Sequence, residues 1–198
     1  GKSTLLRMLS GLGDPTGGSI LLDDISLSQI DPADRRAGIG YLPQDSVLFY
    51  GTLRDNLTLD GARHVDGELL EALDAVGLGP FVRAHPKGLD LPIVGSQAVS
   101  GGQRQAIALA RLLLQDPRIV LMDEPTAAFD QVSERRVVDT LKAWASGRTL
   151  VVATHRRAVL ALADRVIALS GGRVAGDGPA ESKLEIAPEF ATVRKVHG

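Results

Sequence analysis

The 198-residue chain contains no cysteine and few aromatic residues, with one tryptophan, two tyrosines and four phenylalanines. The lack of cysteine excludes disulfide bonds, thiolate catalysis and cysteine-ligated zinc. A strong net charge is also lacking: the formal value is −2, so the chain as a whole has no electrostatic footprint for nucleic acid. No apolar run approaches the ~18 residues that a membrane-spanning helix needs. A globular domain with a sizeable core remains, since 44% of the residues are hydrophobic.

The residues that carry chemical information are concentrated in one stretch, Val99–Asp130. Near its start, Ser100-Gly101-Gly102 supplies backbone N–H groups and no large side chain directly before an amphipathic segment. A helix N-terminus of this kind favours anions, because its first N–H groups are unpaired and the helix dipole is positive there. The helix is predicted from apolar residues at i, i+3, i+4 and i+7, which are Ala106, Leu109, Ala110 and Leu113.

A strand and two carboxylates follow this helix. Asp116-Pro117 ends the helix, and Arg118–Met122 has the length and aliphatic content of a buried parallel strand. Asp123 and Glu124 then stand at the carboxyl edge of the strand, where open α/β sheets bind their ligands.

Two other predicted strands also end in polar side chains. Ile39–Leu42 leads into a loop that carries Gln44, and Thr149–Ala153 leads into Thr154 and His155. Helices are predicted at residues 5–9, 68–76 and 134–145 from their apolar spacing. His64 and His85 lack a second ligand at metal spacing and are interpreted as surface histidines.

The first residues, Gly1-Lys2-Ser3-Thr4, match the tail of the phosphate-binding pattern G-x-x-x-x-G-K-[ST]. In such a loop Lys2 would reach the terminal phosphates and Ser3 would ligate Mg²⁺. The earlier glycines of the pattern would lie before residue 1. We therefore expect the chain to be truncated within this motif and to bind ATP poorly by itself.

SGGQ opening a helix, followed by a hydrophobic strand that ends in DEPT and a loop containing Asp130, resembles the ATPase domain of ABC transporters. The resemblance implies an α/β P-loop NTPase fold of the RecA-like kind, with a mostly parallel sheet and the N-terminal strands missing. It also implies an inserted α-helical subdomain that carries SGGQ. Residues 1–44 and 116–198 would form the core, and residues 45–115 the helical subdomain with the Q-loop.

The same resemblance assigns roles around ATP and Mg²⁺. Catalysis would involve Glu124 as general base, His155 as the γ-phosphate switch and Gln44 as a contact to the attacking water. Mg²⁺ would be surrounded by Ser3, Gln44 and Asp123. Nucleotide binding would use Gly1, Lys2, Ser3 and Thr4 for one ATP, and Ser100, Gly101, Gly102, Gln103 and Asp130 for the ATP of a partner subunit. Ala127 departs from the family, which usually has a small polar residue there.

The segment DSVLFYGTLRDN, residues 45–56, is similar to the Q-loop region of exporter ATPases, which faces the transmembrane domains. Val47–Tyr50 would contact a transmembrane domain, pack onto the helical subdomain, or do both. Residues 81–95, together with Trp144 and Thr154-His155-Arg156, resemble type I secretion exporters of proteins and peptides. The protein would then act at the cytoplasmic face of a bacterial inner membrane, as part of a membrane protein.

Several alternatives remain beside this interpretation. An importer ATPase subunit is disfavoured by LFYGTLRDN, and a non-transport ABC ATPase by the lack of a basic surface or long coiled coil. A non-catalytic partner domain is disfavoured by the presence of Glu124, Gln44 and His155. The expected partners are a second ABC ATPase domain, in a homodimer, and a transmembrane domain. Cargo would not be contacted directly, and nucleic acid would not be a partner. Residues 181–198 are expected to form a polar helix or a frayed tail.

Overall fold

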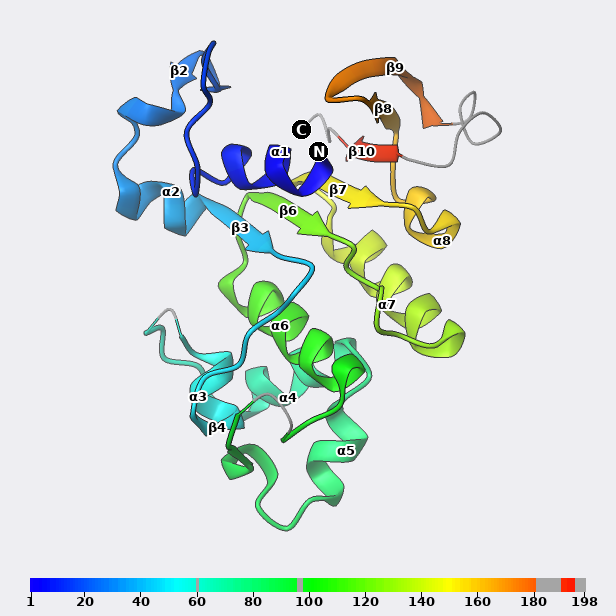
Figure 1. Cartoon of the computed structure of the whole chain (residues 1–198). Helices are drawn as coiled ribbons and strands as arrows, with labels where there is room; N and C mark the ends of the chain where they lie inside the picture. The colour runs from blue at the N-terminus through cyan, green and yellow to red at the C-terminus, as the bar shows by residue number, and fades with distance from the viewer. Residues whose placement is uncertain (60, 96–97, 181–189, 195–198) are drawn as a thin grey trace. The chain divides into compact units, whose positions relative to one another are not determined.

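The computed structural model of the chain describes residues 1–59, 61–95, 98–180 and 190–194 (Figure 1). They belong to two compact units. The first consists of Gly1–Gln44, Pro117–Glu124 and Ala145–Gly198, and the second of Asp45–Asp116 and Pro125–Trp144. Within the described residues, no helix combines the length and the apolar character needed to cross a membrane.

The first unit is built on a six-stranded sheet with the order β3-β6-β7-β10-β8-β9. Strands β3, β6 and β7 are parallel, and β10, β8 and β9 join them through antiparallel pairs. The predicted α/β fold with a parallel sheet core is therefore confirmed. The strands are β3 (Ile39–Leu42), β6 (Ile119–Asp123), β7 (Thr149–Thr154), β8 (Arg165–Ser170), β9 (Arg173–Pro179) and β10 (Phe190–Arg194).

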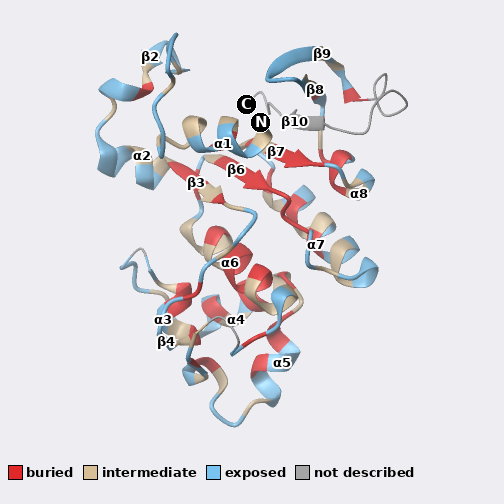
Figure 2. Ribbon diagram, in the orientation of Figure 1, coloured by how far each residue is buried: buried red, intermediate tan, exposed pale blue. Residues whose placement is uncertain are grey.

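The central strands are buried because their sequences are almost entirely aliphatic. In β6, Val120, Leu121 and Met122 are each at most 2% exposed. Together with β7 they form the most deeply buried part of the sheet (Figure 2). Strands with both faces covered carry continuous rather than alternating hydrophobic residues. This is why a short aliphatic run was sufficient to predict β6.

Helix α1 (Lys2–Leu9) contacts β6 and β7 and places Leu6 in their core. A small antiparallel hairpin follows it, formed by β1 (Leu21–Leu22) and β2 (Ile25–Ser26). The unit also contains η1 (Leu27–Gln29), α2 (Pro32–Gly38) and α8 (Arg157–Leu160). The predicted helix at 5–9 and the strands at 39–42 and 149–153 are confirmed.

Strand β10 corrects the expectation for the end of the chain. Residues 190–194 pair with β7 and β8, so a polar helix or frayed tail is wrong for them. The rest of that expectation, residues 181–189 and 195–198, lies outside the described residues. The pattern of Phe190–Arg194 is too short to tell a strand from a loop, so the sequence alone could not predict β10. The strand is defined by its pairing with β7 and β8.

The second unit is mainly helical. Helix α6 (Gly101–Gln115) contacts α3 and α4, and α4 also contacts α5 and α7. The predicted helices at 68–76 and 134–145 appear as α4 and α7. The remaining elements are α3 (Leu53–Leu57), α4 (Asp66–Ala75), α5 (Gly79–Ala84), η2 (Gly88–Asp90), α7 (Gln131–Trp144), and the hairpin β4 (Gly51–Thr52) with β5 (Pro92–Ile93).

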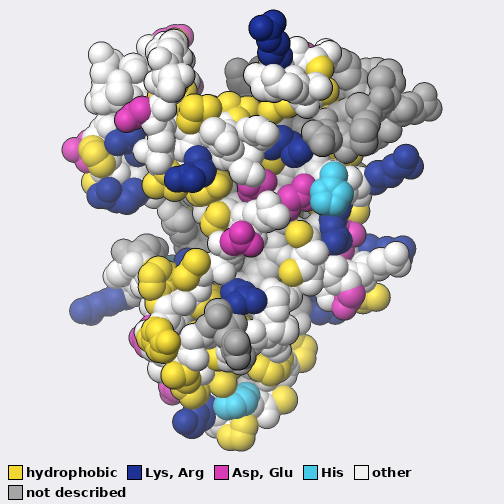
Figure 3. All heavy atoms as spheres, in the orientation of Figure 1, with side chains coloured by type: hydrophobic (Ala, Val, Ile, Leu, Met, Phe, Trp, Pro, Cys, Tyr) yellow, Lys and Arg dark blue, Asp and Glu magenta, His cyan; other side chains and the backbone are white. Residues whose placement is uncertain are grey.

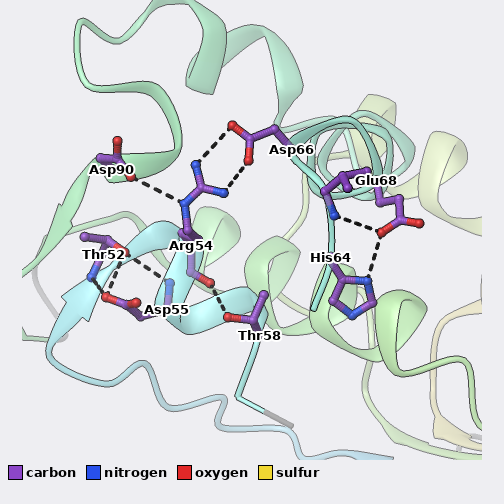
Figure 4. A network of polar contacts seen from close by, with 9 residues as sticks. Thr52, Arg54, Asp55, Thr58, His64, Asp66, Glu68 and Asp90 are labelled. Carbon is purple, nitrogen blue, oxygen red and sulfur yellow. Dashed lines mark hydrogen bonds and ion pairs between the residues drawn. The ribbon is translucent and has the colours of Figure 1, made fainter. Parts of the chain in front are cut away.

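Local side-chain caps set several boundaries in this unit. Thr52 and Asp55 form a capping box at the start of α3, and Ser100 and Gln103 form one at the start of α6. Arg54 of α3 also pairs with Asp66 and Asp90, which ties the starts of α3 and α4 to η2 (Figure 4). Capping boxes satisfy amides that a helix leaves unpaired, so the sequence specifies these boundaries locally.

Candidate functional site

The carboxyl end of β6 carries the two acidic residues that the sequence singled out. Asp123 is 2% exposed, and Glu124 is 7% exposed. The Glu124 amide donates a 2.8 Å hydrogen bond to the Ala153 carbonyl of β7. Glu124 has φ +48, a left-handed conformation that is costly for a residue with a side chain. Such conformations persist where the surroundings enforce them and cluster at functional sites.

Glu124 is bound by side chains from the end of β7. Its Oε1 lies 2.7 Å from Nδ1 of His155, and its Oε2 accepts a 3.1 Å hydrogen bond from the Thr154 hydroxyl. An ionised carboxylate only accepts hydrogen bonds, so in this contact Nδ1 of His155 carries the hydrogen. The His155 side chain is 63% exposed, whereas that of Glu124 is 10% exposed. The pair thus joins a buried, oriented carboxylate to a solvent-facing imidazole.

Asp123 lies one residue earlier on the same strand edge. It acts on Tyr41 of β3. Burial raises the pKa of the Tyr41 hydroxyl, and the negative charge of the Asp123 carboxylate raises that pKa further. Strand β3 pairs in parallel with β6, with Leu42 opposite Met122. Gln44 follows β3 two residues later and is exposed. The sheet therefore directs the ends of β3, β6 and β7 to one edge, as the sequence predicts for Gln44, Asp123 and His155.

Helix α1 contributes the other predicted residues of this unit. It contacts β6 and β7, and Lys2, Ser3 and Thr4 form its first turn. Its N-cap is Gly1, and no side chain among the described residues caps it. The amides of the first turn are therefore available to an anion such as phosphate. Figure 3 shows acidic side chains next to a histidine over the ends of β6 and β7.

The oxygen ligands predicted for Mg²⁺ fit that ion chemically. Hydroxyl, amide and carboxylate oxygens are the donors that Mg²⁺ takes, together with water and phosphate. The described residues contain no group of three or more His, Cys, Asp or Glu that could hold a metal. The predicted ligand set contains one carboxylate, Asp123, beside the neutral ligands Ser3 and Gln44.

The SGGQ residues lie in the second unit, at the start of α6. Ser100 Oγ accepts from the Gln103 amide at 3.2 Å, and Gln103 Oε1 accepts from the Ser100 amide at 2.8 Å. Two N-terminal groups of α6 are therefore already paired by its own side chains. Gly101 and Gly102 differ in their surroundings: a Cβ built on Gly102 would lie 3.0 Å from the Ala128 carbonyl oxygen, whereas Gly101 has only contacts at 4.0 Å.

Gln105 is a residue that the sequence analysis missed. It is 4% exposed, and its Oε1 accepts a 2.8 Å hydrogen bond from the Ala128 amide. It thereby holds the loop after DEPT against α6. Asp130, at the end of this loop, caps α7 by accepting from the Ser133 amide at 2.8 Å. This hydrogen bond, helped by the Ser133 side chain, lowers the pKa of the Asp130 carboxyl.

The segment Val47–Tyr50 has one buried and three exposed side chains. Leu48 is buried, whereas Val47, Phe49 and Tyr50 are at least half exposed, with Tyr50 at 80%. Val94 adds a further exposed apolar side chain in the same unit. Figure 3 shows hydrophobic side chains gathered over α3 and β4. An exposed apolar patch of this kind is typical of a contact surface.

One histidine differs from its sequence interpretation. The side chain of His64 is only 15% exposed, its Nδ1 lies 3.3 Å from Glu68 Oε2, and its Nε2 is buried without a partner among the described residues. The prediction of a surface histidine is therefore wrong for His64. The cause is nonlocal, because α4 and its neighbours cover the ring in a way that residue spacing does not show.

The arrangement in the first unit is that of an α/β nucleotide-binding core: an uncapped helix N-terminus bearing lysine, and carboxylates at the ends of parallel strands. A family model described as ABC transporter matches residues 1–127. The chain therefore belongs to the ABC transporter family, and its class is that of the family's ATPase domains.

Relatives and a solved structure agree with this assignment. The chain is 37% identical over 193 residues to the mycobactin import ATP-binding/permease protein IrtB of Mycolicibacterium thermoresistibile, covering 96% of this chain and 33% of that protein. It is 37% identical over 195 residues to the ATP-dependent lipid A-core flippase of Bordetella avium, covering 98% and 33%. A bacterial Atm1-family ABC exporter with ATP bound matches with a TM-score of 0.87 and 34% identity, over 93% of this chain and 33% of that chain. The chain thus spans about a third of the length of these proteins.

Proposed function

We propose that this chain is the ATP-binding and ATP-hydrolysing domain of an ABC exporter. The observation that carries the proposal is the Glu124–His155 pair beside Asp123, at the edge of the parallel strands. Phosphoryl transfer requires positioned phosphates, an oriented water and compensation of the charge on the γ-phosphate. The chain has a candidate residue for each requirement.

Helix α1 would bind the phosphates. Its free amides point along the helix axis at its positive end, and Lys2 adds a full positive charge there. Gly1 and Thr4 belong to the same turn. Asp123, Ser3 and Gln44 would hold Mg²⁺, which neutralises phosphate charge when bound.

Glu124 would act as the general base toward the attacking water. Because its two carboxylate oxygens are fixed by His155 and Thr154, the side chain has one defined orientation. His155 would contact the γ-phosphate through Nε2 while Glu124 orients the ring. Gln44 would contact the same water from the end of β3.

The second unit would act on the ATP of another copy of this domain. The amides of Gly101 and Gly102 remain free of the Ser100–Gln103 capping box and are available to phosphate. Ser100, Gln103 and Asp130 would complete this surface. We propose that two copies of residues 1–198 form a homodimer with two ATPs at their interface, and that hydrolysis releases it. Residues 1–44 and 116–198 would work as the RecA-like core, and residues 45–115 as the helical subdomain.

The exposed apolar segment Val47–Tyr50 would contact a transmembrane domain and transmit this motion. The protein would then act at the cytoplasmic face of a bacterial inner membrane. Type I secretion of protein or peptide cargo is the finer proposal, supported by the resemblance of residues 81–95. The coding DNA upstream of this chain tests both levels. Several ~20-residue apolar segments would support a fused exporter, and their absence would favour an importer subunit or a non-transport ATPase. A cysteine-peptidase-like or degenerate domain further upstream would narrow the assignment to type I secretion.

The Glu124→Gln variant tests the catalytic proposal. The amide keeps the size of the side chain but is not a base, so turnover of ATP should fall by about 10²–10⁴-fold. In the full-length protein, ATP binding should be retained, and an ATP-dependent dimer should accumulate. Phosphate release and light scattering measure the two effects, with exposed Glu71→Gln as the matched control. Near-normal turnover in Glu124→Gln would exclude Glu124 as the base.

A further inference from the structure

Asn56 is a buried polar residue that holds the segment Val47–Tyr50 from inside. It is 0% exposed. Its Oδ1 accepts from the Phe49 amide at 2.8 Å, and its Nδ2 donates to the carbonyls of Phe49 at 2.9 Å and Thr52 at 3.0 Å. The carboxamide group of Asn56 thus uses both its acceptor oxygen and its two N–H donors.

Arg111 of α6 binds the same residue. Its Nε donates to the backbone carbonyl of Asn56 at 2.7 Å, and its Nη2 lies 3.4 Å from the side-chain Oδ1 of Asn56. Its Cζ also lies 6.0 Å from the centroid of the Phe49 ring, within the range of a cation–π contact. Burial lowers the pKa of the Arg111 guanidinium, yet arginine stays charged in proteins. Charged hydrogen bonds of this kind are among the stronger ones in a protein.

The loop is also held on its solvent side. The Thr52 amide and hydroxyl both donate to Asp55 Oδ2 at 2.8 Å, and Arg54 links α3 to Asp66 (Figure 4). The backbone N–H and C=O of Phe49 are both bound by the Asn56 side chain, whereas the side chain of the adjacent Tyr50 is 80% exposed. A backbone fixed on two sides presents its exposed side chain in one position.

We propose that Arg111 and Asn56 are positioning residues that transmit a displacement of α6 at Ser100–Gln103 to the segment Val47–Tyr50. This inference rests on the proposed function, because it assigns a route between the partner-facing SGGQ residues and the surface that would contact the transmembrane domain. Both ends of the route and both positioning residues lie in the second unit.

The geometry of α6 suits this role. It is a continuous helix of 15 residues, closed by a capping box at Ser100 and by Asp116 in the left-handed conformation. Arg111 lies about 16 Å along the axis from Ser100, at 1.5 Å per residue. Because a capped, packed helix moves as a rigid body, a tilt at its N-terminus displaces the guanidinium. The Arg111–Asn56 hydrogen bonds then carry that displacement to the backbone of Phe49.

Hydrogen–deuterium exchange of the intact protein tests the route. The measurement uses the Glu124→Gln background, with and without Mg-ATP, and follows two peptides, residues 45–57 and residues 99–105. With Arg111 present, ATP should change the exchange of both peptides. In Arg111→Ala the change at 99–105 should persist, and the change at 45–57 should fall by about fivefold or more.

Two further variants distinguish transmission from folding. Asn56→Asp keeps the acceptor for the Phe49 amide but loses both donors, and should uncouple residues 45–57 in the same way. Arg83→Ala removes an exposed ion pair with Asp74 in the same unit, and should leave both responses unchanged.

Each other outcome is decisive. A full response at 45–57 in Arg111→Ala overturns the inference. Loss of both responses in Arg111→Ala and Asn56→Asp alike assigns these residues to folding and overturns it too. If neither peptide responds to ATP while Arg111 is present, the proposed function fails, and this inference fails with it.

Discussion

The N-termini of α1 and α6 differ in how their amides are satisfied. Helix α1 begins at Gly1 and has no side-chain cap among the described residues, whereas α6 begins with the closed Ser100–Gln103 capping box. Every helix leaves about four amides unpaired at this end. In α1 those amides can serve a ligand, but in α6 the side chains already use two of them. The first turn of α1 therefore offers more unpaired amides to a phosphate than that of α6, which would complete a site.

Between the two helix N-termini, the largest expected difference concerns Lys2. Lys2→Ala removes the positive charge at the uncapped helix, so the Kd for Mg-ATP of one domain should rise by about 10–100-fold. Ser100→Ala should leave that Kd unchanged, because α6 would contact only the ATP of the partner copy. Isothermal titration of the monomeric protein checks both, with Arg7→Ala in the last turn of α1 as the charge-matched control. An equal loss in Lys2→Ala and Ser100→Ala would remove the distinction between the two helices.

Ser100→Ala should act on stability instead. Loss of an N-cap hydroxyl costs about 1 kcal/mol, so the free energy of unfolding should decrease by that amount. Lys2 makes no such cap. Lys2→Ala should therefore change ATP affinity and Ser100→Ala should change stability, which distinguishes a ligand-binding helix terminus from one capped by its own side chains.

The comparison also shows what the sequence could predict. Caps and turns are local, so the start of α6 and the turn between α6 and β6 followed from Ser100 and Asp116-Pro117. Apolar spacing alone placed the start of α7 at residue 134, whereas the helix begins at Gln131. The order Gln44, Asp123-Glu124, His155 at strand ends was likewise readable, because parallel strands end at one edge of a sheet. The family resemblance supplied the roles.

Nonlocal pairings were beyond the sequence. Arg111 and Asn56 meet across 55 positions, and Gln105 binds Ala128 across 23. Nothing in the spacing of these residues distinguishes a buried hydrogen bond from a solvated polar side chain. The burial of His64 and the pairing of β10 have the same origin, since both depend on which surfaces the folded chain leaves available.

A smaller effect should separate the two glycines of α6. Gly101→Ala meets only contacts at 4.0 Å, so the helix should gain about 0.5–1 kcal/mol of stability. Gly102→Ala has the same helical gain, but its Cβ would lie 3.0 Å from the Ala128 carbonyl oxygen. That overlap should make Gly102→Ala less stable than Gly101→Ala by about 1–3 kcal/mol. Urea denaturation measures both.

Gly101→Ala should nevertheless weaken the ATP-dependent dimer if Gly101 belongs to the proposed nucleotide surface, because the added methyl group would then meet the partner's phosphate. Equal stability of the two alanine variants would mean that the loop at Ala128 shifts freely, despite its hydrogen bond to Gln105. A normal dimer in Gly101→Ala would remove Gly101 from the nucleotide surface.

The smallest effect concerns Asp130, which caps α7 as Ser100 caps α6. The Ser133 amide lowers the pKa of the Asp130 carboxyl in the folded state. A lowered folded pKa stabilises the protein at pH values above the ordinary carboxyl pKa of about 3.9, and this contribution is lost as the pH falls through the lower folded value. Asp130→Asn keeps an acceptor oxygen without the charge. Its urea midpoint should therefore fall less than the wild-type midpoint between pH 6 and pH 3. Asp139→Asn, exposed on the same helix, is the control; if both variants flatten the pH profile equally, the net charge of α7 rather than the cap is responsible.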